Sequence, residues 1–180
     1  MPLPIIIPMT PADLDEIMVL ERRCFKDFWT RRMYLIDLTE NELATYLVAR
    51  LPSAILAYGG FWLMADEAHI ATVASHPDWR GCGLGEWLTV ALLEAAMARG
   101  ARLATLEVRA GNTAARQLYR KLGFEVEGVR AHYYCDGEDG LIMITPPLAD
   151  PAMQARLAAA RADARARWER CLTLTRATPL

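Results

Sequence analysis

The stretch Arg80-Gly81-Cys82-Gly83-Leu84-Gly85-Glu86 decides how this sequence is interpreted, because it places three glycines within five residues directly before an amphipathic segment. Glycine has no Cβ, so a backbone rich in it can turn tightly and approach a ligand closely. The first turn of the helix that follows has N–H groups without an intrahelical partner and carries the positive end of the helix dipole. The stretch, called the glycine loop below, therefore predicts a site for an anion, most simply a phosphate group.

The chain around the loop has the composition of an ordinary domain. Its 180 residues carry a net charge of −2 and are 53% hydrophobic, which suits one core and requires no nucleic acid. No apolar run approaches the ~20 residues of a membrane helix, and prolines interrupt the apolar start, unlike a signal peptide. The four cysteines form no C-x-x-C pair and the three histidines no H-E-x-x-H pair. We therefore expect reduced thiols, no metal, no membrane partner and a cytoplasmic location.

Hydrophobic periodicity predicts a mixed α/β order in which an antiparallel meander of strands precedes the glycine loop. Thr10, with Pro11 in the first turn, caps the first helix, and Thr30 caps the second. The predicted strands are 5–7, 46–50, 54–64, 68–74, 102–109, 124–134 and 141–145. The predicted helices are 10–25, 30–38, 84–99, 112–122 and 150–172.

The last thirty residues differ in composition from the rest, so we divide the chain into a domain at 1–149 and an Arg/Ala-rich helical extension at 150–180. The extension has six arginines against three acidic residues, and its apolar residues fall on one helical stripe. One interpretation is a helix packed on the domain with solvated arginines. The other is a basic docking or homodimerisation helix, for example for a ribosomal or RNA-bearing partner.

Three known phosphate loops compete for the glycine loop. A Walker loop needs a lysine after its glycines, and none is present. The dinucleotide fingerprint needs a third glycine where Glu86 stands, and it opens a parallel fold instead of following a meander. The third pattern, R/Q-x-x-G-x-G/A, is satisfied by Arg80, Gly83 and Gly85. In this respect the loop resembles the pyrophosphate loop of the GCN5-related N-acetyltransferases (GNAT), which binds coenzyme A; a glycine-rich turn that only starts a helix is the alternative.

Two further segments extend the resemblance, which runs from about residue 5 to residue 148. They read LEVRAGN at 106–112 and ARQLYRKLGF at 115–124. Both are similar to the bacterial ribosomal-protein-alanine N-acetyltransferase (RimI-like) group, as are the Tyr133-Tyr134 pair and the Cys24-Phe25…Trp29-Thr30 segment. The resemblance implies the GNAT fold: a mixed, mostly antiparallel, twisted sheet of six to seven strands flanked by about four helices, here with a C-terminal helix added.

The resemblance also implies the catalytic groups. It places the general base on Glu107, acting directly or through a water, and the general acid on Tyr119. Taken alone, Glu107 could be a surface carboxylate paired with Arg109, and Tyr119 could be a core residue on the apolar stripe of its helix. Asn112 suits a helix N-cap by residue type, and in the family it also contacts coenzyme A.

Acetyl-CoA is the implied cosubstrate. The amides from Gly81 to Glu86 would bind the pyrophosphate, and a bulge or splay at 73–75 would free a backbone N–H for the thioester oxygen. The expected coenzyme A residues are Val73, Ala74, Ser75, Arg80, Gly81, Cys82, Gly83, Leu84, Gly85, Glu86 and Asn112. Cys82 lies too near the pyrophosphate to carry the acetyl group, so we expect direct attack by the amine in a ternary complex.

The acceptor side is expected around Trp29, His132, Tyr133 and Tyr134. His132 stands where the family has asparagine, and Phe28 where proline is usual, so these positions bear on the choice of acceptor. We predict transfer of acetyl to the N-terminal α-amine of a protein, most simply a ribosomal protein, without direct binding of nucleic acid. The alternatives are an acetyltransferase of a small amine or amino acid, and a non-catalytic acyl-CoA-binding module.

Overall fold

The computed structural model describes residues 2–26 and 28–177, with side chains up to residue 173. The strands are β1 (Ile5–Pro8), β2 (Ala44–Leu51), β3 (Ala54–Met64), β4 (Glu67–Ser75), β5 (Leu103–Arg109), β6 (Glu125–Arg130) and β7 (Gly140–Ile144). The helices are α1 (Leu14–Cys24), α2 (Arg31–Thr39), α3 (Leu84–Ala98), α4 (Thr113–Lys121) and α5 (Pro151–Ala177). This order of elements is the one that the sequence predicts.

Local signals in the sequence explain where the helices begin. A single 3-10 turn, Pro11–Asp13, leads into α1, and Thr10 and Asp13 form a capping box around it. The Thr30 hydroxyl accepts a hydrogen bond from Met33 N–H at the start of α2, and the Asn112 side chain accepts one from Ala115 N–H at the start of α4. These side chains satisfy N–H groups that a helix terminus leaves unpaired.

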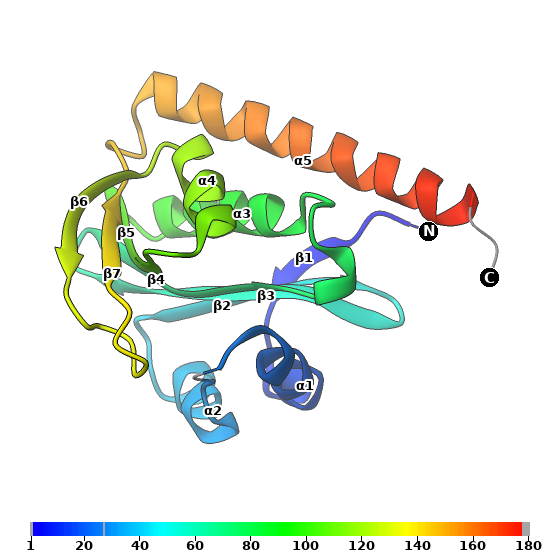
Figure 1. The fold of residues 1–180 in the computed structure, drawn as a ribbon, viewed down its shortest axis with the longest axis horizontal. Coiled ribbons are helices and arrows are strands. Elements are labelled where there is room, and N and C mark those ends of the chain that lie inside the picture. Colours follow the sequence, from blue (N-terminus) through cyan, green and yellow to red (C-terminus); the bar gives the residue numbers. More distant parts are fainter. Residues whose placement is uncertain (1, 27, 178–180) are drawn as a thin grey trace.

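Within the described residues, seven strands form one sheet in the order β1-β2-β3-β4-β5-β7-β6. β4 and β5 run parallel, whereas the other neighbouring pairs are antiparallel. The predicted mixed, mostly antiparallel sheet is therefore confirmed. In Figure 1, α1 and α2 cover one face of the sheet, and α3, α4 and α5 lie on the other.

The sheet opens between its two parallel strands. The β4·β5 ladder runs from Glu67 opposite Leu103 to Ile70 opposite Leu106, where it ends. Beyond this point β4 continues to pair with β3 as far as Ser75, while β5 pairs with β7. The two strands therefore diverge towards their carboxyl ends, and a splay of the kind considered for residues 73–75 is present.

The long helix α5 packs its apolar stripe against the domain. Met153, Leu157, Ala160, Ala164 and Trp168 on this stripe are all at most 3% exposed. Such a stripe at helical spacing buries its apolar area only when it faces a core. The helix thus packs on the domain, as the first interpretation of its sequence predicts, but Arg161 and Arg167 form ion pairs with Glu94 and Glu86 instead of being solvated. A docking role for the helix stays a prediction.

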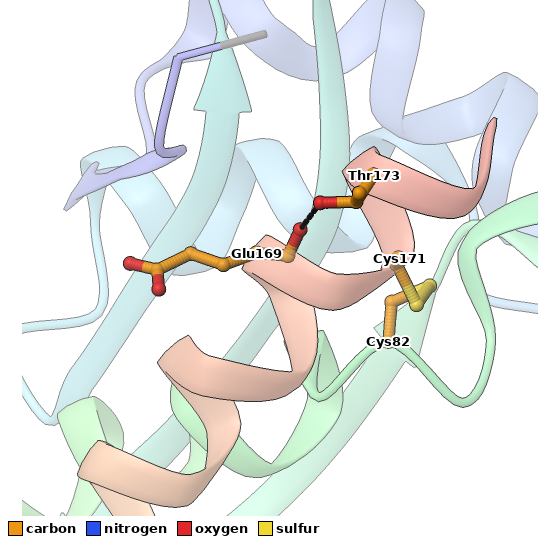
Figure 2. Close-up of a disulfide and its surroundings, with 4 residues drawn as sticks. All are labelled: Cys82, Glu169, Cys171 and Thr173. Atoms are coloured by element: carbon orange, nitrogen blue, oxygen red, sulfur yellow. Dashed lines mark hydrogen bonds between the residues drawn. A yellow bond between two sulfur atoms is a disulfide. The ribbon is translucent and has the colours of Figure 1, made fainter. Parts of the chain in front are cut away.

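A disulfide joins α5 to the glycine loop, and it overturns the expectation of four reduced thiols. Cys82 and Cys171 are bonded, with their Cα atoms 5.8 Å apart (Figure 2). The two residues are 89 positions apart in the chain, so their proximity follows only from the docking of α5. Cys24 and Cys135 are free. The bond also leaves Cys82 without a thiol, in line with our rejection of an acetyl-cysteine.

Among the described residues, no helix has the length and apolar character that crossing a membrane requires. Among the same residues, no cluster of three or more histidine, cysteine or acidic side chains is placed to hold a metal ion.

Candidate cofactor and catalytic site

The glycine loop turns sharply at two positions where only glycine fits comfortably. Gly81 and Gly83 have φ angles of +80° and +90°, in the left-handed region that L-residues disfavour. Gly83 is also the N-cap of α3. At Gly85 a Cβ would lie 3.2 Å from Ser75 Oγ and 3.3 Å from Leu118 Cδ1. The loop is thus held tightly between β4 and α4, with the N-terminus of α3 behind it.

A cavity of about 700 Å³, called the loop cavity below, lies beside the glycine loop. It is bounded by the loop, by the splayed end of β4 and by α4. The predicted coenzyme A residues that line it are Val73, Ala74, Ser75, Arg80, Gly81, Gly83, Leu84, Gly85, Glu86 and Asn112. Cys82 points instead into its disulfide with Cys171. Apart from Cys82, the structure gathers the predicted residues around one space.

The charged lining of the loop cavity suits an anion. Arg80, Lys121 and Arg167 line it together with the carboxylate of Glu86. Lys121 Nζ lies 2.8 Å from Glu86 Oε1, and Arg167 forms a second ion pair with Glu86. Burial opposes the charge on Lys121, but its hydrogen bonds to Glu86 and Asp163 raise its pKa. With three cations, one carboxylate and the amino end of α3, the site fits a ligand that carries phosphate groups.

A second cavity, of about 530 Å³, opens between the α1–α2 segment and the β6–β7 turn. We call it the tryptophan cavity, because Trp29 and Trp62 line it with their rings stacked 5.6 Å apart. Of the described residues, six line both cavities: Cys24, Phe25, Val73, Asn112, Ala115 and Tyr119. The two cavities therefore adjoin where β4 and β5 diverge.

Glu107 lies in the tryptophan cavity with its side chain only 9% exposed. Its Oε2 is 3.1 Å from His69 Nε2, and its Oε1 is 3.2 Å from Arg130 Nη1. Arg109, the partner considered from the sequence, forms ion pairs with Asp136 and Glu138. Glu107 is therefore a largely buried carboxylate at the cavity wall, a position from which it can accept a proton.

Tyr119 lies where the two cavities meet. It is 9% exposed, and its ring packs edge-on against Phe124 with centroids 5.6 Å apart. Burial raises the pKa of Tyr119, with a smaller contribution from Tyr134. The phenol thus stays protonated at neutral pH and can act as a proton donor. Tyr119 is therefore both a core residue, as its apolar stripe indicates, and a residue of the cavity wall, as a general acid requires.

The residues predicted for the acceptor side divide into two groups. Trp29, Tyr133 and Tyr134 line the tryptophan cavity. His132 does not: it has a positive φ of 52°, and its Nδ1 lies 3.0 Å from the Gly137 carbonyl oxygen in the β6–β7 turn. The structure therefore brings three of the four residues together and holds His132 in the turn that carries the two tyrosines.

Glu21 is a buried carboxylate that the sequence marks only as a polar interruption of an apolar stripe. It is 1% exposed; its Oε1 accepts a hydrogen bond from Trp29 N–H, and its Oε2 accepts one from the Tyr34 hydroxyl. Burial, partly offset by these hydrogen bonds, raises the pKa of Glu21. The carboxylate fixes the Trp29 backbone and so shapes one wall of the tryptophan cavity.

Sequence reasoning missed three side chains at the site: His69, Lys121 and Arg167. His69 reaches Glu107 because β4 and β5 are parallel, with His69 in register with Thr105. Lys121 falls inside the 115–124 segment as a basic residue in the last turn of α4, which is a weak signal. Arg167 is one of several arginines in α5, and nothing in its spacing distinguishes it from the others.

Comparison with known proteins gives consistent matches. The model of the "Acetyltransferase (GNAT) family" matches residues 14–124. A putative [ribosomal protein bS18]-alanine N-acetyltransferase of Bacillus subtilis is 39% identical over 136 residues, covering 75% of this chain and 90% of that protein. The Escherichia coli K12 [ribosomal protein bS18]-alanine N-acetyltransferase is 33% identical over 138 residues, covering 75% and 92%.

Solved structures show the same similarity. The crystal structure of the Escherichia coli ribosomal-protein-S18-alanine N-acetyltransferase superposes with a TM-score of 0.74 and 30% identity, covering 81% of this chain and 94% of that one. Chaetomium thermophilum Naa20, in complex with a bisubstrate analogue, superposes with a TM-score of 0.71 and 26% identity, covering 81% and 88%.

Proposed function

The chain belongs to the acetyltransferase (GNAT) family, and from that premise we propose that it acetylates the N-terminal α-amine of a protein, most simply a ribosomal protein. It is an N-acetyltransferase of a family that uses acetyl-CoA. The observation that carries the proposed acceptor is the tryptophan cavity, which joins the loop cavity at Tyr119. Relatives at 39% and 33% identity that are named ribosomal-protein-alanine N-acetyltransferases support the same acceptor class.

The loop cavity is the proposed site of acetyl-CoA. The backbone N–H groups of the glycine loop and the amino end of α3 would hold its pyrophosphate, with Arg80, Lys121 and Arg167 as the nearby cations. When bound, acetyl-CoA supplies an activated acetyl group as a thioester. Asn112, which caps α4 and lines both cavities, is proposed as a further contact.

Glu107 is the proposed general base. A peptide α-amine has a reference pKa near ~8, so at neutral pH it is mostly protonated and cannot attack a carbonyl carbon. The Glu107 carboxylate at the wall of the tryptophan cavity would take that proton, directly or through a water. His69 and Arg130, each within 3.2 Å of one of its oxygens, hold the carboxylate in place.

Tyr119 is the proposed general acid. As the new C–N bond forms, the C–S bond breaks, and the leaving thiolate needs a proton (reference thiol pKa ~8.5). The Tyr119 phenol, kept protonated by burial, would donate it from the junction of the two cavities. A backbone N–H of residues 73–75, beyond the end of the β4·β5 ladder, is the proposed donor to the developing oxyanion.

The deciding experiment supplies acetyl-CoA and measures free CoA release with peptides that differ in their first residue, alongside small amines and free amino acids. We expect peptides to be acetylated at the α-amine, which mass spectrometry locates. The matched control is Glu107→Gln, which should lower kcat by about 100-fold or more, with nearly unchanged CoA affinity.

Other results of this experiment would support the alternative functions instead. Turnover of small amines or amino acids alone would replace the peptide acceptor with a small one. Binding of acetyl-CoA without turnover of any acceptor would indicate a binding module. Full activity of Glu107→Gln would remove Glu107 as the base.

A further inference from the structure

Helix α5 lies directly on the glycine loop, and its contacts there are close. At Gly83 an added Cβ would lie 2.6 Å from Ala164 O and 3.0 Å from Ala164 Cα. The Cys82–Cys171 disulfide fixes the same helix to the same loop further along. The family model ends at residue 124, so α5 lies outside the segment that this model matches. The glycine loop of this chain is thus covered by a helix that lies outside the matched segment.

Glu86 creates an electrostatic problem for an anion site. It is the third residue of α3, only 4% exposed, and it lines the loop cavity. A carboxylate in the first turn of a helix interacts favourably with the helix dipole. The same negative charge opposes a phosphate group at that terminus, and at low solvent exposure the repulsion is poorly screened. Without neutralisation, Glu86 would weaken binding of the ligand that the glycine loop is built for.

Arg167 of α5 supplies that neutralisation. It pairs with Glu86 Oε2 and itself lines the loop cavity. The second partner of Glu86 is Lys121, which is shared, since its Nζ also lies 3.1 Å from Asp163 Oδ2. Among the described residues that line the cavity, removing Arg167 would leave two cations, Arg80 and Lys121, against the Glu86 carboxylate.

We propose that α5 is part of the cofactor site, and that Arg167, by pairing with Glu86, sets the charge of the glycine loop so that it accepts the phosphates of coenzyme A. Arg167 is in this sense a positioning residue that acts through Glu86. The inference rests on the proposed function, because it takes the loop cavity as the coenzyme A site. It adds that the C-terminal helix contributes to that site and is more than a cover over the core.

The test measures CoA binding directly, by titration calorimetry, in three variants of the full chain. Arg167→Gln removes the pairing charge, and we expect Kd for CoA to rise about tenfold or more, as for loss of an interaction with a charged group. The double variant Glu86→Gln, Arg167→Gln removes both charges of the pair and restores the net charge of the lining. We expect it to bind CoA within about twofold of the wild type.

Arg170→Gln is the matched control. Arg170 is exposed on the same helix and does not line the loop cavity, so the substitution changes the total charge equally without touching Glu86. Its Kd should equal that of the wild type. Steady-state kinetics separate binding from folding: for Arg167→Gln the KM for acetyl-CoA should rise while kcat at saturation stays within about twofold, and the thermal midpoint identifies any unfolded variant.

Each outcome supports or overturns the proposed role of Arg167. An unchanged Kd for Arg167→Gln, or an equal loss for Arg170→Gln, overturns a role for Arg167 at the site. A double variant as weak as the single one overturns action through Glu86. Should Arg167→Gln fail to fold, Glu86→Gln alone tests the charge argument, because removing the carboxylate leaves the lining more positive and should lower Kd for CoA, whereas an unchanged Kd would overturn it. If the wild type itself binds no CoA, the proposed function fails instead.

Discussion

Replacing Gly83 with alanine tests the docking of α5 on the glycine loop. A Cβ at this position would meet Ala164 O at 2.6 Å and Ala164 C at 3.2 Å. Both are backbone atoms in the middle of a helix, so neither can rotate away as a flexible side chain would. The variant can fold only if the loop or α5 shifts. The disulfide between Cys82 and Cys171 limits that shift, because it joins the two elements close to the clash.

Gly81 offers a matched control from the same loop. Its φ of +80° is as unfavourable for alanine as that of Gly83, but a Cβ there meets nothing within 4 Å. Both substitutions therefore incur about 1–2 kcal/mol for a left-handed L-residue. Only Gly83→Ala adds the overpacking of α5, about 1–3 kcal/mol. We expect the free energy of unfolding to fall by about 1–2 kcal/mol in Gly81→Ala and by about 2–5 kcal/mol in Gly83→Ala.

Urea denaturation of the oxidised protein measures this difference, and CoA binding provides a second readout. For a chain of this size a loss of 1 kcal/mol lowers Tm by about 2–4 °C, so the two variants should be resolved by thermal unfolding as well. Equal destabilisation of Gly81→Ala and Gly83→Ala would refute the reasoning, because it would mean that α5 does not constrain the loop at Gly83.

Three further predictions concern other parts of the molecule. Tyr119→Phe should lower kcat about 100-fold or more while leaving CoA affinity intact, and a fully active variant would show that Tyr119 is only a packing residue. Because burial raises the pKa of Tyr119, ionisation of this phenol should not lower the wild-type rate up to about pH 10. Cys171→Ser should lower the free energy of unfolding by about 4 kcal/mol, as expected for opening a long disulfide loop, and reductant should do the same to the wild type but not to the variant; insensitivity of the wild type to reductant would contradict the disulfide. Burial raises the pKa of Glu21 in the folded protein. Glu21 therefore contributes most to the free energy of unfolding below the ordinary glutamate pKa of about 4.3, and this contribution is lost as pH rises through the higher pKa of the folded state. The free energy of unfolding of the wild type relative to Glu21→Gln should therefore fall as pH increases from about 4 to 7, and a constant difference in urea titrations would show that Glu21 does not titrate as described.

The order and type of the elements could be predicted from the sequence because local signals specify them. The caps at Thr10, Thr30 and Asn112 have the residue types that helix starts prefer, and their side chains form the expected hydrogen bonds. The glycine loop could be predicted for the same reason, since positive φ angles at Gly81 and Gly83 require a residue without Cβ. Because an antiparallel meander precedes the glycine loop, a parallel dinucleotide-binding fold could be excluded from the sequence.

The partners of the site residues could not be predicted, because they depend on tertiary contacts. Glu107 meets His69 through the register of a parallel strand pair, and Glu86 meets Arg167 through the docking of a helix 81 positions further along. The pairing of Cys82 with Cys171 arises in the same way. The orientation of His132 could not be predicted either. Its sequence position suggested a contact with the acceptor, but in the structure its ring lies against the Gly137 carbonyl oxygen in the β6–β7 turn.

The Cys82–Cys171 bond has a topological consequence. It closes the chain from residue 82 to residue 171 into a covalent ring that carries α3, β5, α4, β6, β7 and most of α5, while everything before it is an open tail. The β6–β7 turn, with its mostly exposed residues 131–138, is the kind of segment in which proteases nick folded proteins. A single cut there would convert the oxidised molecule into two chains still joined by one bond, with α5 tethered to the loop. Reduction of such a nicked molecule would remove the only covalent link between the chains, so its two pieces would separate on a denaturing gel only after reduction.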